Sequence, residues 1–486
     1  MKSKIMAEDE RLAFQSRLAG LEQESRRLAD DNEKLRSDQQ ALKNHEAELE
    51  ALLNRNPATG LPIRRVFDRD FERLLAEVLA QERGPRIAVG LLRLGSDYEK
   101  IKNIRDRNRV LLYKTADRIK SIVGDNVYQS DRLDEFLVIF RNMPNIDGVE
   151  LRADQIVEEI SRPHEPPADD VRFGCSLGTA VFPYHGETRE ELLGNADIAL
   201  TESERTRSPH VVYTDQMGDR YRERRSLETE LKAAIQGGFE QFSLHFQPFV
   251  NRDRKITGAE ALIRWNHPSV GLIPPTRFIP IAEEIGSIRF IGQWTLYRAC
   301  RQLKAWHRDG YDDLDISINL SPSQFNQVDL AERIDGILDS VRLKGTSLKL
   351  ELTETTIMED PEDAIVTMNQ LRDQGITMSL DDFGTGYSSL SYLRRFPIET
   401  LKIDRSFVTD VDTNRANQEI VKAMIGMARS FGMQTLAEGV EREEELELLF
   451  DLGCDHVQGF YFSKAVPDTE FQELLSNGGE FRSVGA

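Results

Sequence analysis

The chain has 486 residues, of which 39% are apolar and 30% are charged, and its formal net charge is −20. A length of this size allows two to four domains, because one domain takes roughly 100–200 residues. The acidic balance excludes a nucleic-acid polymer as the expected partner, since such binding needs a positive surface. The sequence has no long apolar run, no secretory leader and no paired cysteine motif, so we expect a cytoplasmic protein without a membrane span.

The first 55 residues carry a heptad repeat. Leucine recurs every seventh residue at Leu21, Leu28, Leu35, Leu42 and Leu49. If these leucines are the d positions of the heptad, the a positions would form the rest of the contact surface, here called the seam. The a positions are mostly polar and include Asn32. Leucine at d positions with asparagine at an a position favours a parallel two-stranded coiled coil. We therefore predict a coiled-coil helix over 1–55 that joins two chains in a homodimer, and the alternative is a single solvated helix.

Residues 56–215 mix helix and strand patterns. The segment Val66–Ala80 has the apolar spacing of a helix. Three apolar runs, Ile87–Leu92, Phe136–Phe140 and Cys175–Phe182, are typical of buried strands. This combination predicts an α/β or α+β domain.

A charged linker helix is predicted over 216–239, and it leads into the last region, 240–486. Short apolar strands alternate there with amphipathic helices. Eight candidate strands are Phe242–Phe246, Ala259–Trp265, Asp315–Leu320, Leu348–Leu352, Thr377–Asp381, Thr400–Ile403, Thr435–Ala437 and His456–Phe460. Eight strands in roughly 240 residues predict a (β/α)8 TIM-type barrel. A doubly wound open sheet is the alternative, but it would require a glycine-rich turn after its first strand.

Polar side chains recur within or at the C-terminal ends of seven of these strands, and reaction sites form at that end of such barrels. They are Glu260, Asn319, Glu351, Asp381 with Asp382, Lys402, Glu438 and Gln458. A single carboxylate at a strand end has an ordinary explanation as a loop charge or a helix cap. Carboxylates that converge to about 4 Å from one another would repel by about 4 kcal/mol per pair. A cluster of them therefore requires protons or bound cations. Oxygen donors of this kind suit Mg²⁺ or Mn²⁺.

The segment Asp381–Leu390 adds two adjacent aspartates before a glycine-containing loop. Adjacent aspartates suggest one carboxylate that bridges two metal ions and a neighbour that binds one of them. Two such ions could activate a water and stabilise the leaving oxygen of a phosphodiester. The alternative is an ordinary helix entry capped by Ser388.

The segment Gly258–Trp265 reads Gly-Ala-Glu-Ala-Leu-Ile-Arg-Trp and resembles the signature of the EAL-domain cyclic di-GMP phosphodiesterases. Further motifs of that family follow in order at Gln247–Pro248, Asn319–Ser321, Glu351–Glu354, Asp381–Gly386, Leu401–Asp404, Ala437–Glu441 and Gln458–Phe460. The resemblance covers about half of the chain. It implies a TIM-type barrel that hydrolyses cyclic di-GMP to linear pGpG with two Mg²⁺ or Mn²⁺ ions per barrel.

The resemblance also implies a role for each residue that matches a motif. Glu260, Asn319, Glu351 and Asp381 would bind one metal ion, and Asp381 would bridge to the second ion with Asp382 beside it. Lys402 and Glu438 would hold and polarise the attacking water, with Glu438 as the general base. Gln247, Leu262, Arg264, Glu441 and Gln458 would contact the nucleotide, and Glu354 would brace the loop after Asp382. No substitution stands at these positions, so we expect an active enzyme; the alternative is a non-catalytic cyclic di-GMP receptor that signals to a protein partner.

The middle region resembles a GGDEF diguanylate cyclase domain at Pro57–Pro62, Ser176–Ala180 and Asn195–Leu200. Its signature is altered, because Arg132 and Leu133 replace the two glycines that let the backbone approach a triphosphate. By the same resemblance, the metal-binding aspartate and the nucleotide-binding asparagine are replaced by Leu94 and Lys102, and the inhibitory Arg-x-x-Asp positions hold Val123 and Asn126. We therefore expect a degenerate domain without cyclase activity, with GTP as at most a bound ligand, that serves in regulation or dimerisation.

Overall fold

The computed structural model describes residues 17, 20, 27, 32–45, 53–80, 86–95, 98, 105–163, 174–384 and 390–477, with the backbone alone at 105–108, 382, 390 and 391. Contacts divide the chain into two compact units, Met1–Glu223 and Arg224–Ala486. The helix α7 (Asp215–Gln236) crosses this boundary. In the described part of the chain, no helix has the length and apolar character needed to cross a membrane.

The first unit is built on a five-stranded sheet with the order β2-β3-β1-β4-β5. Its strands are β1 (Arg86–Leu94), β2 (Val127–Gln129), β3 (Glu135–Met143), β4 (Cys175–Val181) and β5 (His210–Val212). The central strand β1 pairs antiparallel with β3 and β4, and β5 lies parallel to β4. The predicted α+β domain is thereby confirmed.

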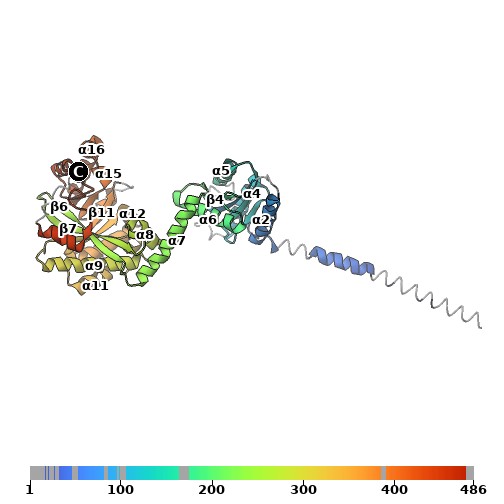
Figure 1. The fold of residues 1–486 in the computed structure, drawn as a ribbon, viewed down its shortest axis with the longest axis horizontal. Helices are drawn as coiled ribbons and strands as arrows, with labels where there is room; N and C mark the ends of the chain where they lie inside the picture. The colour runs from blue at the N-terminus through green and yellow to red at the C-terminus, as the bar shows by residue number, and fades with distance from the viewer. Residues whose placement is uncertain are drawn as a thin grey trace, which may run out of the picture. The chain divides into compact units, whose positions relative to one another are not determined.

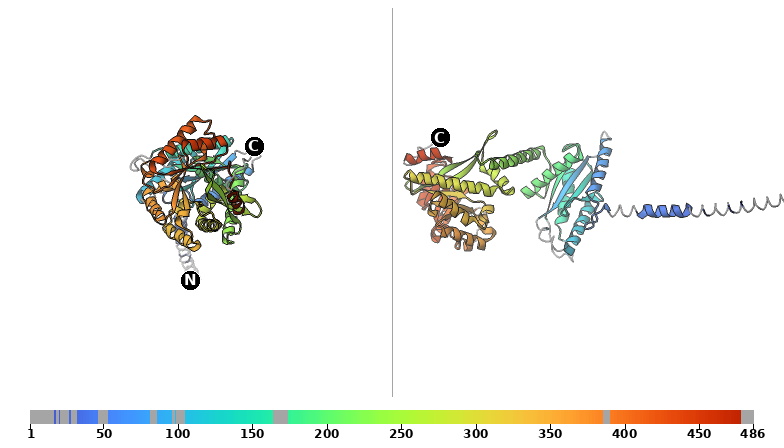
Figure 2. Two further views of the ribbon diagram at one scale, coloured as in Figure 1. Left: turned by 90° about the vertical axis from the view of Figure 1, so that its left-hand side faces the viewer. Right: turned by 90° about the horizontal axis from the view of Figure 1, so that it is seen from below.

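Helices cover both faces of this sheet because β1 is apolar on both sides (Figure 2). Ile87, Val89 and Leu91 pack with α2 (Arg64–Leu79) and α6 (Arg189–Thr206). The alternate residues Ala88 and Leu92 pack with α4 (Arg105–Val123) and α5 (Ile146–Ser161). Successive side chains of a strand point to opposite faces, so one strand supplies both cores.

The second unit is an eight-stranded barrel, as the strand pattern predicts. Its strands are β6 (Phe242–Asn251), β7 (Ile256–His267), β9 (Asp315–Asn319), β10 (Leu348–Thr353), β11 (Thr377–Phe383), β12 (Thr400–Ile403), β13 (Gln434–Glu438) and β14 (His456–Gln458). From β7 to β14 the neighbours pair in parallel. Two short strands, β8 (Gly271–Ile273) and β15 (Val466–Pro467), extend the edges of this sheet.

The first barrel strand departs from the regular (β/α)8 pattern. The strand β6 runs antiparallel to both of its neighbours, β7 and β14, and it closes the barrel between them. The reason is the connection, because residues 252–255 join β6 to β7 as a tight turn rather than a helix. Arg254 takes a left-handed conformation there, with φ of 58°. A chain that reverses in so few residues can form only an antiparallel pair.

Helices pack on the outside of the barrel (Figure 1). They are α8 (Pro275–Glu284), α9 (Ile288–Arg308), α10 (Pro322–Phe325), α11 (Leu330–Val341), α12 (Glu354–Glu359), α13 (Pro361–Asp373), α14 (Leu390–Leu393), α15 (Arg405–Val408), α16 (Arg415–Phe431), α17 (Glu443–Leu452) and α18 (Asp468–Ser476). Alternate strand residues, such as Ile316 and Ile318, face these helices in the main core. The residues between them, such as Ser317 and Asn319, therefore point into the barrel.

The part of α7 that lies in the second unit is packed against the barrel. Leu227 and Leu231 share one core cluster with Phe242, Trp265 and Phe278. The compact unit therefore begins at Arg224, within the helix that the sequence predicts as a charged linker.

Candidate functional site

The strand register brings the predicted site residues to one end of the barrel. Glu351 lies opposite Asn319 on the neighbouring strand, and Glu438 lies opposite Gln458. Asp381 on β11 is paired with Thr353, two residues beyond Glu351. These residues occupy the C-terminal halves of their strands, which is the end where barrel enzymes build reaction sites.

Lys402 is the centre of the cluster. Its ammonium group Nζ lies 2.6 Å from Glu351 Oε2, 3.2 Å from Asp381 Oδ1 and 2.5 Å from Glu438 Oε1. The lysine side chain is 2% exposed and that of Glu351 is 1% exposed. One buried cation therefore holds carboxylates from three different strands, β10, β11 and β13.

Glu260 is the centre of a second group of contacts. Its Oε1 accepts a hydrogen bond of 2.6 Å from the Asn319 amide, and its Oε2 accepts one of 2.8 Å from the Gln458 amide. The Gln458 amide also donates to Gln247 Oε1 at 3.1 Å. Since Glu260 raises the pKa values of both Lys402 and Glu438, the two groups of contacts belong to one electrostatic site.

Burial and like charge set the protonation of the cluster. Burial raises the pKa of Glu438 to about 7, with Lys402 opposing and the neighbouring carboxylates adding to the shift. Burial also raises the pKa of Glu351 well above its ordinary value, in spite of the Lys402 charge. Burial works against the charge on Lys402, but the surrounding carboxylates raise the pKa of its ammonium well above the ordinary value. The lysine is therefore charged at neutral pH.

The donor set fits hard divalent cations. Four carboxyl groups, those of Glu260, Glu351, Asp381 and Glu438, act electrostatically on the single ammonium of Lys402, so the site has more acidic groups than its one cation can pair. The Asn319 amide group donates to Glu260, which leaves its carbonyl oxygen for another ligand. All of these ligands are oxygens, which suits Mg²⁺ or Mn²⁺ rather than zinc.

Of the residues predicted to contact the nucleotide, only some have hydrogen bonds to this cluster. Gln247 and Gln458 join it directly, and Oε1 of Gln458 is buried without a hydrogen-bond partner among the described residues. Arg264 on β7 is half-buried and donates to the carbonyl of Ile263; burial lowers the pKa of its guanidinium, with Glu260 opposing. Leu262, on the same strand, is half-buried.

The remaining predicted residues lie at or beyond the C-terminal ends of the strands. Glu354 is 5% exposed at the start of α12, and neither carboxylate oxygen has a hydrogen-bond partner in the described part of the chain. The side chain of Asp382 lies outside the described residues, and so does Ser388, the helix cap of the alternative interpretation. Glu441 forms an ion pair with Arg405 at 2.7 Å, and the described residues show no ion pair between Glu441 and Lys402.

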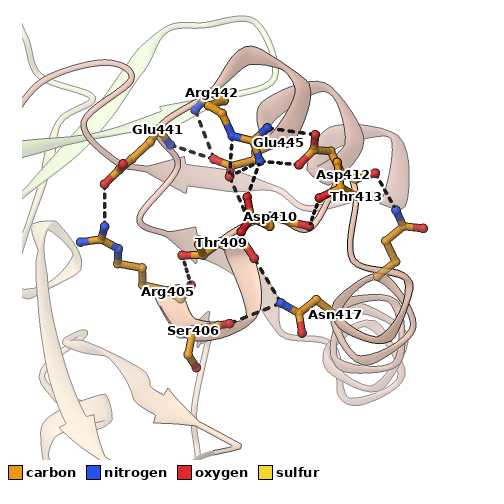
Figure 3. A network of polar contacts seen from close by, with 11 residues as sticks. Arg405, Ser406, Thr409, Asp410, Asp412, Thr413, Asn417, Glu441, Arg442 and Glu445 are labelled. Carbon is orange, nitrogen blue, oxygen red and sulfur yellow. Dashed lines mark hydrogen bonds and ion pairs between the residues drawn. The ribbon is translucent and has the colours of Figure 1, made fainter.

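An ion-pair network that sequence reasoning missed holds the loops around Glu441 (Figure 3). Arg442 lies 3.1 Å from Asp410, 2.5 Å from Asp412 and 2.9 Å from Glu445. These three carboxylates are close enough to share a metal ion, but the Arg442 guanidinium already forms an ion pair with each of them. The spacing of Arg442 and Glu445 at the start of α17 was the available signal, since residues three apart meet on a helix.

Two carboxylates of the hairpin between β2 and β3 in the first unit form ion pairs with arginines of the same chain. Arg132 binds Asp134 through two hydrogen bonds, of 3.1 and 2.8 Å. Although partial burial opposes ionisation, Arg132 holds the pKa of Asp134 below its ordinary value. Arg93 lies opposite Glu135 in the strand register and approaches it to 2.8 Å. Leu94 is buried at the end of β1, and Lys102 lies outside the described residues.

The fold and the site thus define a chain with a cyclase-like α+β unit followed by a barrel that carries a lysine–carboxylate cluster. The model of the family described as "EAL domain" matches residues 228–465, and that described as "Diguanylate cyclase, GGDEF domain" matches residues 54–209. The chain therefore belongs to the tandem GGDEF–EAL proteins.

The names of curated relatives agree with this assignment. The "Bifunctional diguanylate cyclase/cyclic di-GMP phosphodiesterase MucR" of Pseudomonas aeruginosa is 35% identical over 84% of this chain and 60% of its own length. The "Cyclic di-GMP phosphodiesterase PdeR" of Escherichia coli is 31% identical over 87% of this chain and 63% of its own. The chain spans roughly half to two thirds of the curated relatives that it matches. A solved "EAL Enzyme Bd1971" in its cGMP-bound form is 30% identical over 71% of this chain and 82% of that one, with a TM-score of 0.51.

Proposed function

We propose that the barrel hydrolyses cyclic di-GMP to linear pGpG with two bound Mg²⁺ or Mn²⁺ ions. The observation that carries this proposal is the buried contact of Lys402 with Glu351, Asp381 and Glu438 at the C-terminal ends of parallel strands. Four carboxylates and an amide oxygen around one lysine suit divalent cations. The names of the relatives MucR and PdeR support cyclic di-GMP as the substrate.

The metal ligands in this proposal are Glu260, Asn319, Glu351 and Asp381, with Asp381 and Asp382 serving the second ion. Bound ions would polarise the phosphate and lower the pKa of the attacking water. Lys402 holds three carboxylates in place and carries positive charge toward the developing phosphate charge. Glu438 accepts the proton of the attacking water, and its pKa of about 7 in the metal-free chain suits a general base near neutral pH.

The nucleotide would be held beside the metal ligands by side chains of β6, β7 and β14. Gln247 and Gln458 already hydrogen-bond one another there, and Oε1 of Gln458, which has no partner among the described residues, could accept a hydrogen bond from a guanine N–H. Arg264 would pair with a phosphate, while Leu262 and Glu441 would line the same substrate. Glu354 would brace the loop after Asp382.

The first unit would regulate the barrel without synthesising cyclic di-GMP. Arg132 and Arg93 occupy the carboxylates of Asp134 and Glu135, which a metal–nucleotide complex would need free. We therefore infer that this unit has no cyclase activity, and that it and the N-terminal helix serve in regulation or dimerisation. Whether the first unit binds GTP is a question for a direct binding measurement.

The test is turnover of cyclic di-GMP by the full chain, followed by separation of the nucleotides. With Mg²⁺ or Mn²⁺ we expect pGpG, and with a chelator we expect none. Glu260→Gln keeps the shape of the side chain but removes its charge, so kcat/KM should fall by about 100-fold or more. The control Glu399→Gln makes the same change at an exposed residue just before the opposite, N-terminal end of β12 and should retain turnover.

Tight binding of cyclic di-GMP without turnover in either metal would overturn the enzyme proposal in favour of a receptor that signals to a protein partner. Incubation of the full chain with GTP and Mg²⁺ should give no cyclic di-GMP. Formation of that product would contradict the inference about the first unit.

A further inference from the structure

We propose that Ser317 is a positioning residue that fixes Glu351 for metal binding from within the barrel. The inference rests on the proposed function, since it concerns how the chain holds one of the proposed metal ligands. Ser317 lies on β9, two residues before Asn319, and it is 1% exposed.

Both oxygens of Glu351 have a fixed donor. The Ser317 hydroxyl donates to Oε1, and the Lys402 ammonium donates to Oε2 at 2.6 Å. Two donors on different oxygens set both the direction and the plane of a carboxylate. Each carboxylate oxygen has two acceptor sites, so Glu351 can still bind a cation on the side away from these donors.

The strand register explains why a serine stands there. Glu351 lies opposite Asn319, and Ser317 lies one inward-facing position lower on the same strand. Ile316 and Ile318, which flank the serine, face the outer helices in the main core. The hydroxyl therefore reaches Glu351 from the inward-facing position next below Asn319 on β9.

A polar cavity beneath the site explains why such a donor is needed. The cavity has a volume of about 250 Å³, and Ser317, Glu351 and Lys402 are among its lining residues. Lys349 and His456 line it as well. Because there is open space on that side, packing alone does not restrain the Glu351 carboxylate, and the hydroxyl supplies the restraint. The same space leaves room for an added methyl group at position 317.

The experiment measures Mn²⁺ binding to the full chain without substrate, by the electron paramagnetic resonance signal of the free ion. Ser317→Val and Ser317→Thr have nearly the same shape but differ in the hydroxyl group. The loss of a hydrogen-bond partner to a metal ligand typically costs 10–100-fold in affinity. We expect a loss of about 10–100-fold in Ser317→Val, and an affinity for Ser317→Thr close to that of the unaltered chain.

The matched control is Ser379→Ala, compared with Ser317→Ala. Ser379 is 4% exposed, lines the same cavity and lies opposite Glu351 on β11. The described residues show no hydrogen bond from its hydroxyl to Glu351. Removal of the same atom should therefore weaken Mn²⁺ binding at position 317 but leave it unchanged at position 379. The comparison of Ser317→Ala with Ser379→Ala also tests the role of Ser317 if the bulkier Ser317→Val does not fold.

The outcomes separate this inference from the proposed function. Unchanged Mn²⁺ affinity in Ser317→Ala, or an equal loss in Ser379→Ala, would overturn the role of Ser317 and leave hydrolysis by the unaltered chain untouched. Failure of the unaltered chain to bind Mn²⁺ would overturn both. In turnover assays, saturating Mn²⁺ should restore the kcat of Ser317→Ala, and the KM for cyclic di-GMP should stay unchanged, because the residue acts only through the metal ligand.

Discussion

Lys402 is the residue on which the electrostatics of the barrel site depend. Its buried ammonium is within 3.2 Å of three carboxylates that come from separate strands. Removal of one partner from a buried ion pair is costly, since it leaves uncompensated charge in a medium of low polarity. Without bound metal, this lysine is the charge that lets the carboxylates remain together.

We predict that Lys402→Met destabilises the metal-free barrel by about 3–5 kcal/mol. The three tryptophans of the chain, Trp265, Trp294 and Trp306, all lie in the second unit, so urea unfolding followed by their fluorescence reports the barrel. Lys349→Met is the control, because the described residues give this lysine one ion pair, with Asp315 at 3.3 Å, so its loss should cost about 1 kcal/mol or less. Equal losses in the two variants would contradict the central role of Lys402.

The sequence predicted the charged members of the site but not the residues that orient them. Glu260, Glu351 and Lys402 were found because they stand within or at the C-terminal ends of predicted strands, and because they match the motifs of a known family. Ser317 carries no motif, and its role depends on which strand lies beside β9 and in which register. Its place between two isoleucines was nevertheless a usable signal, since alternation predicts that it points into the barrel.

At the scale of elements, the short strands and the connection between β6 and β7 were the hardest to predict. The strands β2 and β5 have three residues each, which is too few for an alternating pattern to be recognised. The eight barrel strands were found because each combines an apolar core with a neighbouring helix. The reversed direction of β6 was missed because it depends on the four-residue turn at 252–255, where no helix fits.

The helix α7 illustrates how a charged sequence can hide a packing surface. Leu227, Leu231 and Ala234 follow one face at spacings of four and three, and all are buried against the barrel. The many charges around them favoured an interpretation as a linker. The apolar stripe shows instead that the last part of the helix is a component of the second unit.

We therefore predict that a fragment 224–486 is more stable than a fragment 240–486. The shorter fragment lacks Leu227 and Leu231 and uncovers Phe242 and Trp265. Loss of two buried leucines should cost about 3–6 kcal/mol. Urea unfolding measures the difference, and tryptophan fluorescence of the shorter fragment should shift to longer wavelength. Indistinguishable unfolding curves would show that α7 does not stabilise the barrel.

At the scale of the whole molecule, the chain contains two units with separate cores, and the sequence predicted both. The apolar clusters of the first unit involve residues below 224, and those of the barrel involve residues above it. What the sequence predicts beyond these units is self-association through 1–55. Within the described residues of that segment, Leu35 is 59% exposed and Leu42 is 61% exposed, while the other three heptad leucines lie outside them.

A leucine stripe that is exposed on a single chain gains stability when a second copy covers it, so we predict that the seam of 1–55 drives dimer formation. Leu35→Lys with Leu42→Lys places two charges in the seam and should weaken dimerisation by at least about tenfold, because each leucine contributes roughly 2 kcal/mol on burial. Ser37→Lys with Asn44→Lys adds the same charge outside the seam and should leave the dimer intact. Sedimentation equilibrium of the full chain measures both. A mass that is unchanged in the leucine variant would assign self-association, if present, to another part of the chain.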